Sequence, residues 1–306
     1  MQTLTQAHYD AFWRDGVITL PDAVTPAQLT ALRAEFAGWI EGSRAHTKPY
    51  GQMLDGRARF DIEPKSHSAT TPALRRVSAP TEISSVYLDV MRNSRMTDMV
   101  ADLIGPNVKH HHNKINSKQP GSATEVKWHQ DFPFTPHSNT DIVTALLMVD
   151  EVTDDNGPLE VALGSHKGEL HSLWHDGVFT GAVDPKIEAD YKRNAAVSKG
   201  PAGSVCLMHT CLAHGSVQEV IDRSNLLTYT VSGEGVQRLA AEFADHPDVL
   251  VTPFGAKLHV SARDKEALNT AIKPYRQDRT LHWEESTPSL EDVFIDMMTR
   301  AKDNFQ

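Results

Sequence analysis

The sequence predicts a mainly β protein with flanking helices, folded as a cupin-like jelly roll of two sheets. Short apolar segments separated by turn residues begin after Pro106, and long, uneven intervals separate these segments. A regular alternation of strands and helices, which a parallel α/β sheet would require, is missing from the pattern. Because the sequence contains no internal repeat and no low-complexity linker, we expect a single domain over 1–306.

The first part of the chain, about 1–105, is expected to be mainly helical. In "TPAQLTALRAEFAGWI", Thr25 is a typical N-cap, Pro26 suits the first helical position, and Gln28 completes a capping box. A second helix, "SRMTDMVADLIGP", should end at Gly105. The apolar stripe of "TPSLEDVFIDMMTRA" predicts a C-terminal helix at about 287–303.

The jelly-roll core is expected at about 106–262. The segment "TDIVTALLMVDEV" is almost continuously apolar and rich in β-branched residues, which predicts a strand buried on both faces. The segment 168–202 has no periodicity, and a stretch of that length is often a lid or a binding loop. The candidate strands lie at 108–117, 124–130, 141–150, 158–162, 203–208, 211–218 and 225–233.

The bulk composition excludes several classes of partner. The chain of 306 residues has a net charge of −10 and a pI of about 5.9, which argues against nucleic acid or an anionic membrane surface as partner. Its two cysteines, Cys206 and Cys211, are too few for a disulfide framework and fit a reducing compartment. Without a signal-like segment or an apolar run of about 20 residues, we expect a cytoplasmic protein that acts on a small molecule. The sequence leaves the oligomeric state open.

The pattern His-x-Asp occurs three times, and it predicts a shared metal only on a strand. Residues two apart lie on the same face of a strand, whereas on a helix they do not face each other. The pair in His8-Tyr-Asp10 lies in a helical pattern, and the pair in His246-Pro-Asp248 lies in a turn around a proline. Only the pair in His129-Gln-Asp131 lies at a strand end.

A second histidine on a predicted strand, His214 in "CLAHGSVQEV", lies 85 residues after His129. In a jelly roll, strands far apart in sequence can be neighbours, so His129, Asp131 and His214 are candidates for one site. Two imidazoles and one carboxylate on the same side of an ion are typical of non-haem Fe(II) oxygenases. In the alternative interpretation, His214 is a hydrogen-bonded core residue and His129 lies at the rim.

Three segments and one arginine carry a resemblance to a known family. The segments are "WHQDF" at 128–132, "NGPLEVALGSH" at 156–166 and "HGS" at 214–216, followed by Arg223. Together they resemble the phytanoyl-CoA dioxygenase family of Fe(II)/2-oxoglutarate-dependent oxygenases. The similarity extends over about 1–235, and it implies the double-stranded β-helix of that family, in agreement with the strand pattern.

The resemblance also implies a role for individual residues. It implies that His129, Asp131 and His214 hold Fe(II). Arg223 matches a position where members bind the far carboxylate of 2-oxoglutarate, although some members place this arginine where the chain has Asn225. Further contacts of the co-substrate are expected from the hydroxyl of Ser216 and from Lys114. In the alternative interpretation, Arg223 is a solvated turn residue and Lys114 a surface lysine.

The implied reaction consumes O2 and 2-oxoglutarate, releases succinate and CO2, and hydroxylates an unactivated C–H bond. Desaturation, ring closure or demethylation are other outcomes of the same oxidant. Two further classes use a similar site. A Zn(II) hydrolase also has three nitrogen and oxygen ligands plus water, and a non-catalytic cupin-like binding protein would retain the fold without turnover.

The expected substrate is a small, partly polar metabolite, such as an amino acid. Aromatic walls with a few polar groups suit a molecule of that kind, and the sequence has no evident basic cluster for a CoA thioester. The consecutive histidines of "HHHNK" are expected to have a structural or surface role, because at most His110 and His112 can share a side of a strand. The candidate substrate residues are Phe134, His137, Trp174 and His175.

Overall fold

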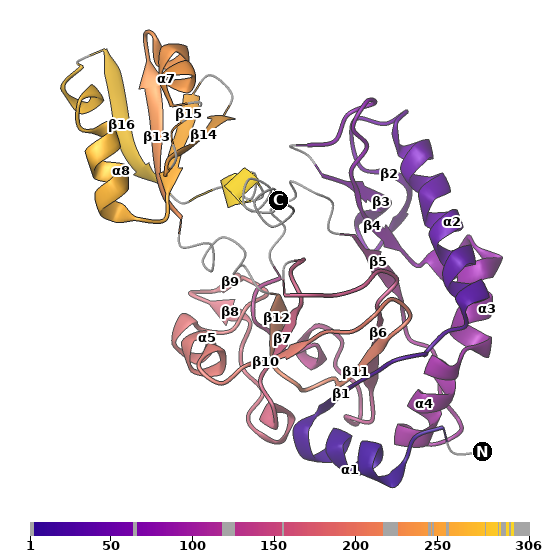
Figure 1. Cartoon of the computed structure of the whole chain (residues 1–306). Helices are drawn as coiled ribbons and strands as arrows, with labels where there is room; N and C mark the ends of the chain where they lie inside the picture. The colour runs from indigo at the N-terminus through magenta and orange to yellow at the C-terminus, as the bar shows by residue number, and fades with distance from the viewer. Residues whose placement is uncertain are drawn as a thin grey trace, which may run out of the picture. The chain divides into compact units, whose positions relative to one another are not determined.

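The computed structural model divides the chain into two compact units, 1–217 and 218–306. Each unit is considered by itself (Figure 1). The structure describes residues 3–63, 66–117, 126–154, 156–216, 226–243, 246, 248–254, 257–278, 280–286, 288, 292–293 and 295–296.

The first sheet of the jelly roll has a strand that is buried on both faces at its centre. The side chains of Val205 and Leu207 pack against the helices outside the sheet, whereas Cys206 and Met208 point to the other sheet. The expected burial of 141–150 on both faces is wrong, because the strand found there lies at the edge and has only intermediate or exposed residues. The antiparallel strands, in spatial order, are β1 (Val17–Leu20), β11 (Val205–His209) and β6 (Val143–Leu147).

The second sheet carries the "HGS" segment. It packs face to face against the first sheet, because Val161 and Leu212 form one buried cluster with Cys206 and Met208. Both cysteines of the chain are free thiols. The antiparallel strands, in spatial order, are β10 (Ala196–Ser198), β7 (Leu159–Val161) and β12 (His214–Ser216).

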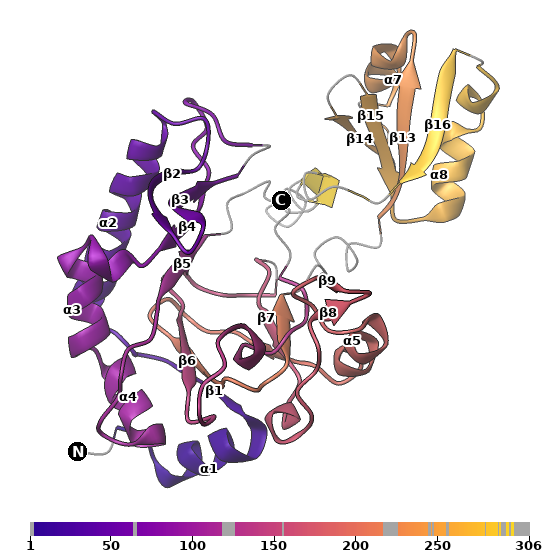
Figure 2. The same cartoon turned by 180° about the vertical axis from the view of Figure 1, so that it is seen from behind.

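Three of the four strands of a third antiparallel sheet lie within the part of the chain expected to be mainly helical, about 1–105. That expectation is only partly right, because the turn Asp55-Gly56, with φ of 48° and 77°, joins two strands as a hairpin. The helix α2 (Pro26–Ser43) covers one face of this sheet (Figures 1 and 2). The strands, in spatial order, are β2 (Tyr50–Leu54), β3 (Arg57–Ile62), β4 (Leu74–Ser78) and β5 (Lys114–Asn116).

The helices of the first unit begin and end as their sequences predict. Thr25 and Gln28 form the capping box of α2, and the predicted second helix ends at Gly105. Two helices cover the outer face of the first sheet, where Phe12, Met99 and Leu103 pack. Besides α2, the α-helices of this part are α1 (Gln6–Asp15), α3 (Ser85–Asn93) and α4 (Arg95–Ile104), and a short 3₁₀ helix, η1 (Pro80–Glu82), precedes α3.

The aperiodic segment 168–202 contains short elements of its own. Two two-residue strands form a small ribbon, and a helix with Asp184 as N-cap follows them. The elements from the metal-ligand region onward are η2 (Phe132–Phe134), η3 (Ser165–Lys167), β8 (Trp174–His175), β9 (Val178–Phe179) and α5 (Pro185–Lys192).

The second unit is a four-stranded antiparallel sheet with two helices packed on one face through Leu239, Leu268 and Ile272. The strand expected at 225–233 is present, but it pairs with β15 and β16 and with neither jelly-roll sheet. Its apolar pattern predicts a strand and carries no information about its partner. In chain order the elements are β13 (Leu227–Gly233), α7 (Val236–Glu242), β14 (Leu250–Phe254), β15 (Lys257–Ala262), α8 (Lys265–Ile272), η4 (Tyr275–Gln277) and β16 (Leu281–Ser286).

The domain boundaries stay a prediction. Of the predicted C-terminal helix at 287–303, residues 292, 293, 295 and 296 are helical, and most of the others lie outside the described residues. Among the helices that the structure describes, none is long and apolar enough to cross a bilayer.

Candidate metal centre

The backbone brings the two candidate histidines together. His129 and His214 form an isolated antiparallel bridge, in which the N–H of each donates to the carbonyl of the other at 2.9 Å. His214 is also the partner of Val161 in the sheet, so β12 lies between β7 and the segment that carries His129. Strand pairing therefore accounts for the contact between residues that are 85 positions apart.

The glycine of "HGS" allows this pairing. A Cβ atom at Gly215 would lie 2.9 Å from the indole ring of Trp128, closer than real side chains approach. Trp128 is 1% exposed and precedes His129, so its indole lies flat against β12. On the other side of the turn, the N–H of Phe132 donates to the carbonyl of Thr210 at 2.9 Å. The residues on both sides of the ligand pair are thus held to the β11–β12 region.

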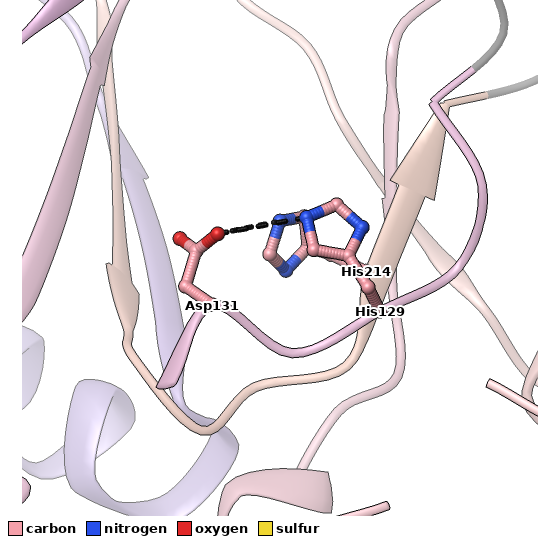
Figure 3. Close-up of side chains that lie close together, drawn as sticks. All are labelled: His129, Asp131 and His214. Carbon is pink, nitrogen blue, oxygen red and sulfur yellow. Dashed lines mark ion pairs between the residues drawn. The ribbon is translucent and has the colours of Figure 1, made fainter. Parts of the chain in front are cut away.

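Three side chains converge from these segments (Figure 3). The Nε2 atoms of His129 and His214 lie 3.5 Å and 3.8 Å from Oδ1 of Asp131. One donor atom from each residue lies within 4.8 Å of the other two, which is close enough to share one ion. Among the described residues, this is the one group of three or more His, Cys, Asp or Glu side chains placed in this way.

Hydrogen bonds orient each of the three side chains. Nδ1 of His129 donates to the carbonyl of Lys127 at 2.6 Å, and Nδ1 of His214 donates to that of Leu212 at 2.9 Å. Because a carbonyl only accepts, both rings carry their proton on Nδ1 and leave Nε2 free to bind a metal. Oδ2 of Asp131 accepts from the hydroxyl of Thr144 at 2.8 Å, which leaves Oδ1 toward the histidines.

The electrostatics of the site fit a divalent cation. Burial opposes ionisation of Asp131, but its contacts with the His129 ring, the His214 ring and the Thr144 hydroxyl together hold the pKa of this carboxyl well below its usual range. Burial lowers the pKa of His214, which keeps its imidazole neutral. A carboxylate and neutral imidazoles are the donor set of non-haem Fe(II) sites, so the residues present fit that metal.

The other two His-x-Asp pairs have local structural roles. His8 completes the capping box of α1 with Thr5, and Asp10 accepts from Gln6 one turn earlier. Nδ1 of His246 accepts from the N–H of Asp248 at 3.2 Å. Among the described residues, only the middle pair lies within reach of another histidine in such a group, and its role as a metal site stays a prediction.

Gln130, which lies between His129 and Asp131, holds the neighbouring segments in place. Its sequence context did not indicate this role. Gln130 is fully buried, and its amide donates to the carbonyls of Cys211 at 2.8 Å and Glu169 at 3.2 Å. Its Oε1 accepts from the N–H of His171 at 2.9 Å. Because i and i+2 share one face, the residue between them must point the other way. Gln130 thus joins the metal site to the start of the segment 168–202.

The expected co-substrate residues have different outcomes. Lys114 lies at the start of β5, close enough to Asp131 for this carboxylate to act on its pKa. The Ser216 hydroxyl is buried and accepts from the N–H of Val126 at 2.8 Å. Arg223 lies outside the described residues. The roles assigned to these three residues stay predictions.

Aromatic side chains extend from the metal site toward solvent. Phe134 contacts His129 edge to face, with ring centroids 5.3 Å apart, and Phe179 contacts Phe134 in the same manner. Trp174 lies against Phe179 and is 60% exposed. Leu146, on the same face of β6 as Thr144, is 36% exposed. Part of the face of β6 that carries Thr144 is thus accessible to solvent.

His175 and His137, which were expected to contact the substrate, form local hydrogen bonds. The ring of His175 donates to the carbonyl of Ala182 at 2.9 Å, and that of His137 donates to Thr135 at 2.7 Å. His137 also contacts His111, which in turn contacts His112. The predicted strand 108–117 is present only at 114–116, so the alternation of sides expected for "HHHNK" does not apply.

The fold and the metal site together define the class of this protein, the jelly-roll proteins with a His-x-Asp…His metal site. A family model described as phytanoyl-CoA dioxygenase matches residues 12–220, more than half of the chain. The protein belongs to the phytanoyl-CoA dioxygenase family. The resemblance seen in the sequence is therefore confirmed.

Similar proteins support this membership. The "probable alpha-ketoglutarate-dependent hypophosphite dioxygenase" of Stutzerimonas stutzeri is 35% identical over 158 residues, which is 50% of this chain and 54% of that protein. The "L-proline trans-4-hydroxylase" of Streptomyces griseoviridis is 26% identical over 225 residues, 67% of this chain and 77% of that one. The chain thus spans about half of the first relative and about three quarters of the second.

A solved structure confirms the fold. The iron-bound crystal structure of EctD from S. alaskensis superposes with a TM-score of 0.55, is 23% identical, and covers 70% of this chain and 71% of that one. The predicted cupin-like jelly roll with flanking helices is therefore confirmed.

Proposed function

We propose that the protein is an Fe(II)- and 2-oxoglutarate-dependent dioxygenase that hydroxylates a C–H bond of a small polar metabolite. The observation that carries this proposal is the placement of His129 and His214 opposite each other in one strand pair, with Asp131 beside both. A set of ligands on one side of an ion leaves the opposite side open for co-substrate and oxygen. Membership of the phytanoyl-CoA dioxygenase family supports the same activity.

Fe(II), when bound, would supply the oxidation chemistry, and the residues of the chain would hold and orient the reactants. With Fe(II) bound, O2 and 2-oxoglutarate provide the oxidant that converts R–H to R–OH, and the co-substrate leaves as succinate and CO2. His129, Asp131 and His214 hold the ion. The Thr144 hydroxyl restrains Asp131 so that Oδ1 remains toward the histidines. The hydrogen bonds at Nδ1 keep both Nε2 lone pairs free.

The co-substrate needs cationic and hydroxyl partners for its far carboxylate. Arg223 offers a guanidinium that binds a carboxylate through two parallel hydrogen bonds. Ser216 lies two residues from His214, and because its oxygen already accepts from Val126, its hydroxyl hydrogen is the part left for a carboxylate. Lys114 would contribute positive charge from the β5 side of the site.

The substrate belongs beside the aromatic residues that extend from the metal site. Phe134, Phe179 and Trp174 offer an apolar wall that begins at His129, and Trp174 is exposed at its outer end. The two relatives are named for hypophosphite and for L-proline, both small polar molecules. These names support a small polar metabolite as the substrate class, with an amino acid as one member. A cytoplasmic location stays a prediction.

The test starts with anaerobic addition of Fe(II) and 2-oxoglutarate to the purified protein. Oxygen and a panel of small polar metabolites follow, with succinate and oxygen consumption as readouts. We expect the wild type to bind Fe(II) and to release succinate, and His214→Ala to lose both properties. His246→Ala is the matched control, because the contacts of His246 with Asp248 and Phe243 are local.

The outcomes separate the candidate classes. A hydrolase that uses Zn(II) at the same residues would consume no oxygen and would ignore 2-oxoglutarate. A binding protein would retain ligands without turnover. Wild-type metal content and activity in His214→Ala would overturn the assignment of the three ligands.

A further inference from the structure

The sheet β2–β5 has one apolar and one polar face. Ile62, Leu74 and Val77 point toward α2 and form a buried cluster with its aromatic side chains. The pairing between β3 and β4 shifts after Asp61, because Asp61 is opposite Arg76 whereas Ile62 is opposite Leu74. Two residues of β4 then correspond to one of β3, which is a β-bulge. Arg75 and Arg76 both lie on the face opposite Leu74 and Val77.

These two consecutive arginines have different surroundings. Arg75 donates twice to Oδ2 of Asp61, at 2.9 Å and 2.7 Å, and is therefore neutralised. Arg76 has no ion-pair or hydrogen-bond partner within the part of the chain that the structure describes, and its Nε is buried without an acceptor. Burial and the charges of Arg75 and Arg57 lower the pKa of Arg76, whereas Asp61, which is opposite Arg76 and bound to Arg75, acts to raise it. A half-buried cation without its own hydrogen bond or ion pair is costly, because its lost hydration is not replaced.

The register places this cation beside Lys114, which lies near Asp131. In the pairing of β4 with β5, Arg76 is opposite Asn116 and Ser78 is opposite Lys114, so Arg76 and Lys114 are diagonal neighbours on one face. Lys114 and Arg57 are exposed, and Lys114 lies within electrostatic reach of Asp131, Arg76 and Arg57. Positive charge therefore extends from Arg57 and Arg76 to Lys114, which lies near Asp131.

The anion that these cations bind could be 2-oxoglutarate or the substrate. The far carboxylate of 2-oxoglutarate already has proposed partners on and after β12, namely Ser216 and Arg223. Arg76 belongs to a different sheet, on the side of the site that carries Asp131 and Lys114. Among the described residues, Arg57, Arg76 and Lys114 have no carboxylate in an ion pair. The carboxylates that act on Arg76 and Lys114 are Asp61, which binds Arg75, and Asp131, which lies beside the two histidines, so the cations are available to an external anion.

We propose that Arg76 is a substrate-binding residue that takes an oxyanion group of the substrate, with Arg57 adding positive charge. The inference rests on the proposed function and narrows its substrate class to small anionic metabolites, with a phosphonate or a carboxylate as the charged group. A guanidinium suits both groups, because its planar fork donates two hydrogen bonds to two oxygens. Anchoring the charged end at β4 would direct the rest of the molecule past Lys114 toward the iron.

The test measures binding of two probes, methylphosphonate and acetate, to the metal-free protein by calorimetry. The variants are Arg76→Gln, Arg76→Lys and the control Arg92→Gln, which removes the same charge from an exposed position on α3. We expect Arg76→Gln to weaken binding of at least one probe about 10- to 100-fold, because a charge-assisted hydrogen bond is lost. Arg76→Lys should lose less, and Arg92→Gln should match the wild type.

A second measurement distinguishes the substrate from the co-substrate. In anaerobic Fe(II)-loaded protein, the affinity for 2-oxoglutarate should stay within about twofold of wild type in Arg76→Gln. A weakened affinity for 2-oxoglutarate would assign Arg76 to the co-substrate and overturn the inference. Failure of the wild type to bind either probe, or equal binding by Arg76→Gln, would also overturn it. Failure of the wild type to bind Fe(II) and 2-oxoglutarate would instead overturn the proposed function, because the probe titrations use neither.

Discussion

Thr144→Val tests whether the Thr144 hydroxyl orients Asp131 for metal binding. Valine has nearly the same shape as threonine, so the substitution removes the 2.8 Å hydrogen bond to Asp131 Oδ2 without opening a cavity. A hydrogen bond to a charged group contributes about 1.5–3 kcal/mol, or roughly 10- to 150-fold in affinity. Because the Asp131 side chain is 31% exposed, water would replace part of the lost bond. We therefore expect Fe(II) to bind about tenfold more weakly.

Anaerobic Fe(II) titration by calorimetry measures this effect, with Thr19→Val as the matched control. Thr19 also has a 2.8 Å side-chain hydrogen bond in the jelly roll, but its partner is Ser198 and not a metal ligand. The control should bind Fe(II) as the wild type does. Equal Fe(II) affinity in Thr144→Val, Thr19→Val and wild type, with unchanged thermal midpoints, would show that Thr144 does not orient the ligand.

Three further predictions concern the co-substrate, the substrate and the pH dependence of stability. Arg223→Leu should raise the dissociation constant for 2-oxoglutarate roughly 30- to 1000-fold in anaerobic titrations, and an unchanged constant would move the role to another cation. Trp174→Ala should weaken substrate-coupled hydroxylation while Fe(II) and 2-oxoglutarate still bind; loss of both ligands would make the 168–202 segment part of the scaffold. Burial and the charge of His166 lower the pKa of His209 to about 4, although the nearby carboxylate of Asp141 acts to raise it. The unfolded chain, with a histidine pKa of about 6.5, binds the extra proton first, so the free energy of unfolding should fall from pH 6.5 to about 4. Denaturant titrations should show a shallower fall in His209→Asn.

The His-x-Asp part of the candidate metal site was predictable because the rule that selects it is local. Residues two apart share a face of a strand and not of a helix, which separates His129 and Asp131 from the pair at His8 and Asp10. The contact between His129 and His214 is not local, and their strand pairing appears only in the fold. The role of Thr144 needed the same information, because nothing in its own segment shows that its hydroxyl faces a carboxylate.

Other features depend on pairings that the sequence does not encode in one segment. The strand predicted at 225–233 has the expected pattern, but its neighbours β15 and β16 lie later in the chain, in the second unit. The sequence shows no basic cluster around Arg57, Arg76 and Lys114, because these residues come from three strands. Only the register of β3, β4 and β5 places them on one face, and the bulge in β4 adds Arg76 to it.

Arg75 and Arg76 should differ in their contribution to stability, and this difference tests whether Arg76 has a structural or a ligand-binding role. Arg75 forms two hydrogen bonds with Asp61. Its replacement would leave the Asp61 carboxylate unpaired and lower the midpoint temperature of thermal unfolding. Among the described residues Arg76 has no hydrogen-bond or ion-pair partner, and burial disfavours its charge more than Asp61 favours it, so Arg76→Gln should leave the midpoint unchanged or raise it. A residue that stabilises nothing while it carries a charge beside a metal site is best explained by a ligand. If Arg76→Gln instead lowered the midpoint as much as Arg75→Gln, Arg76 would have a structural role, and its charge would not need an anionic substrate.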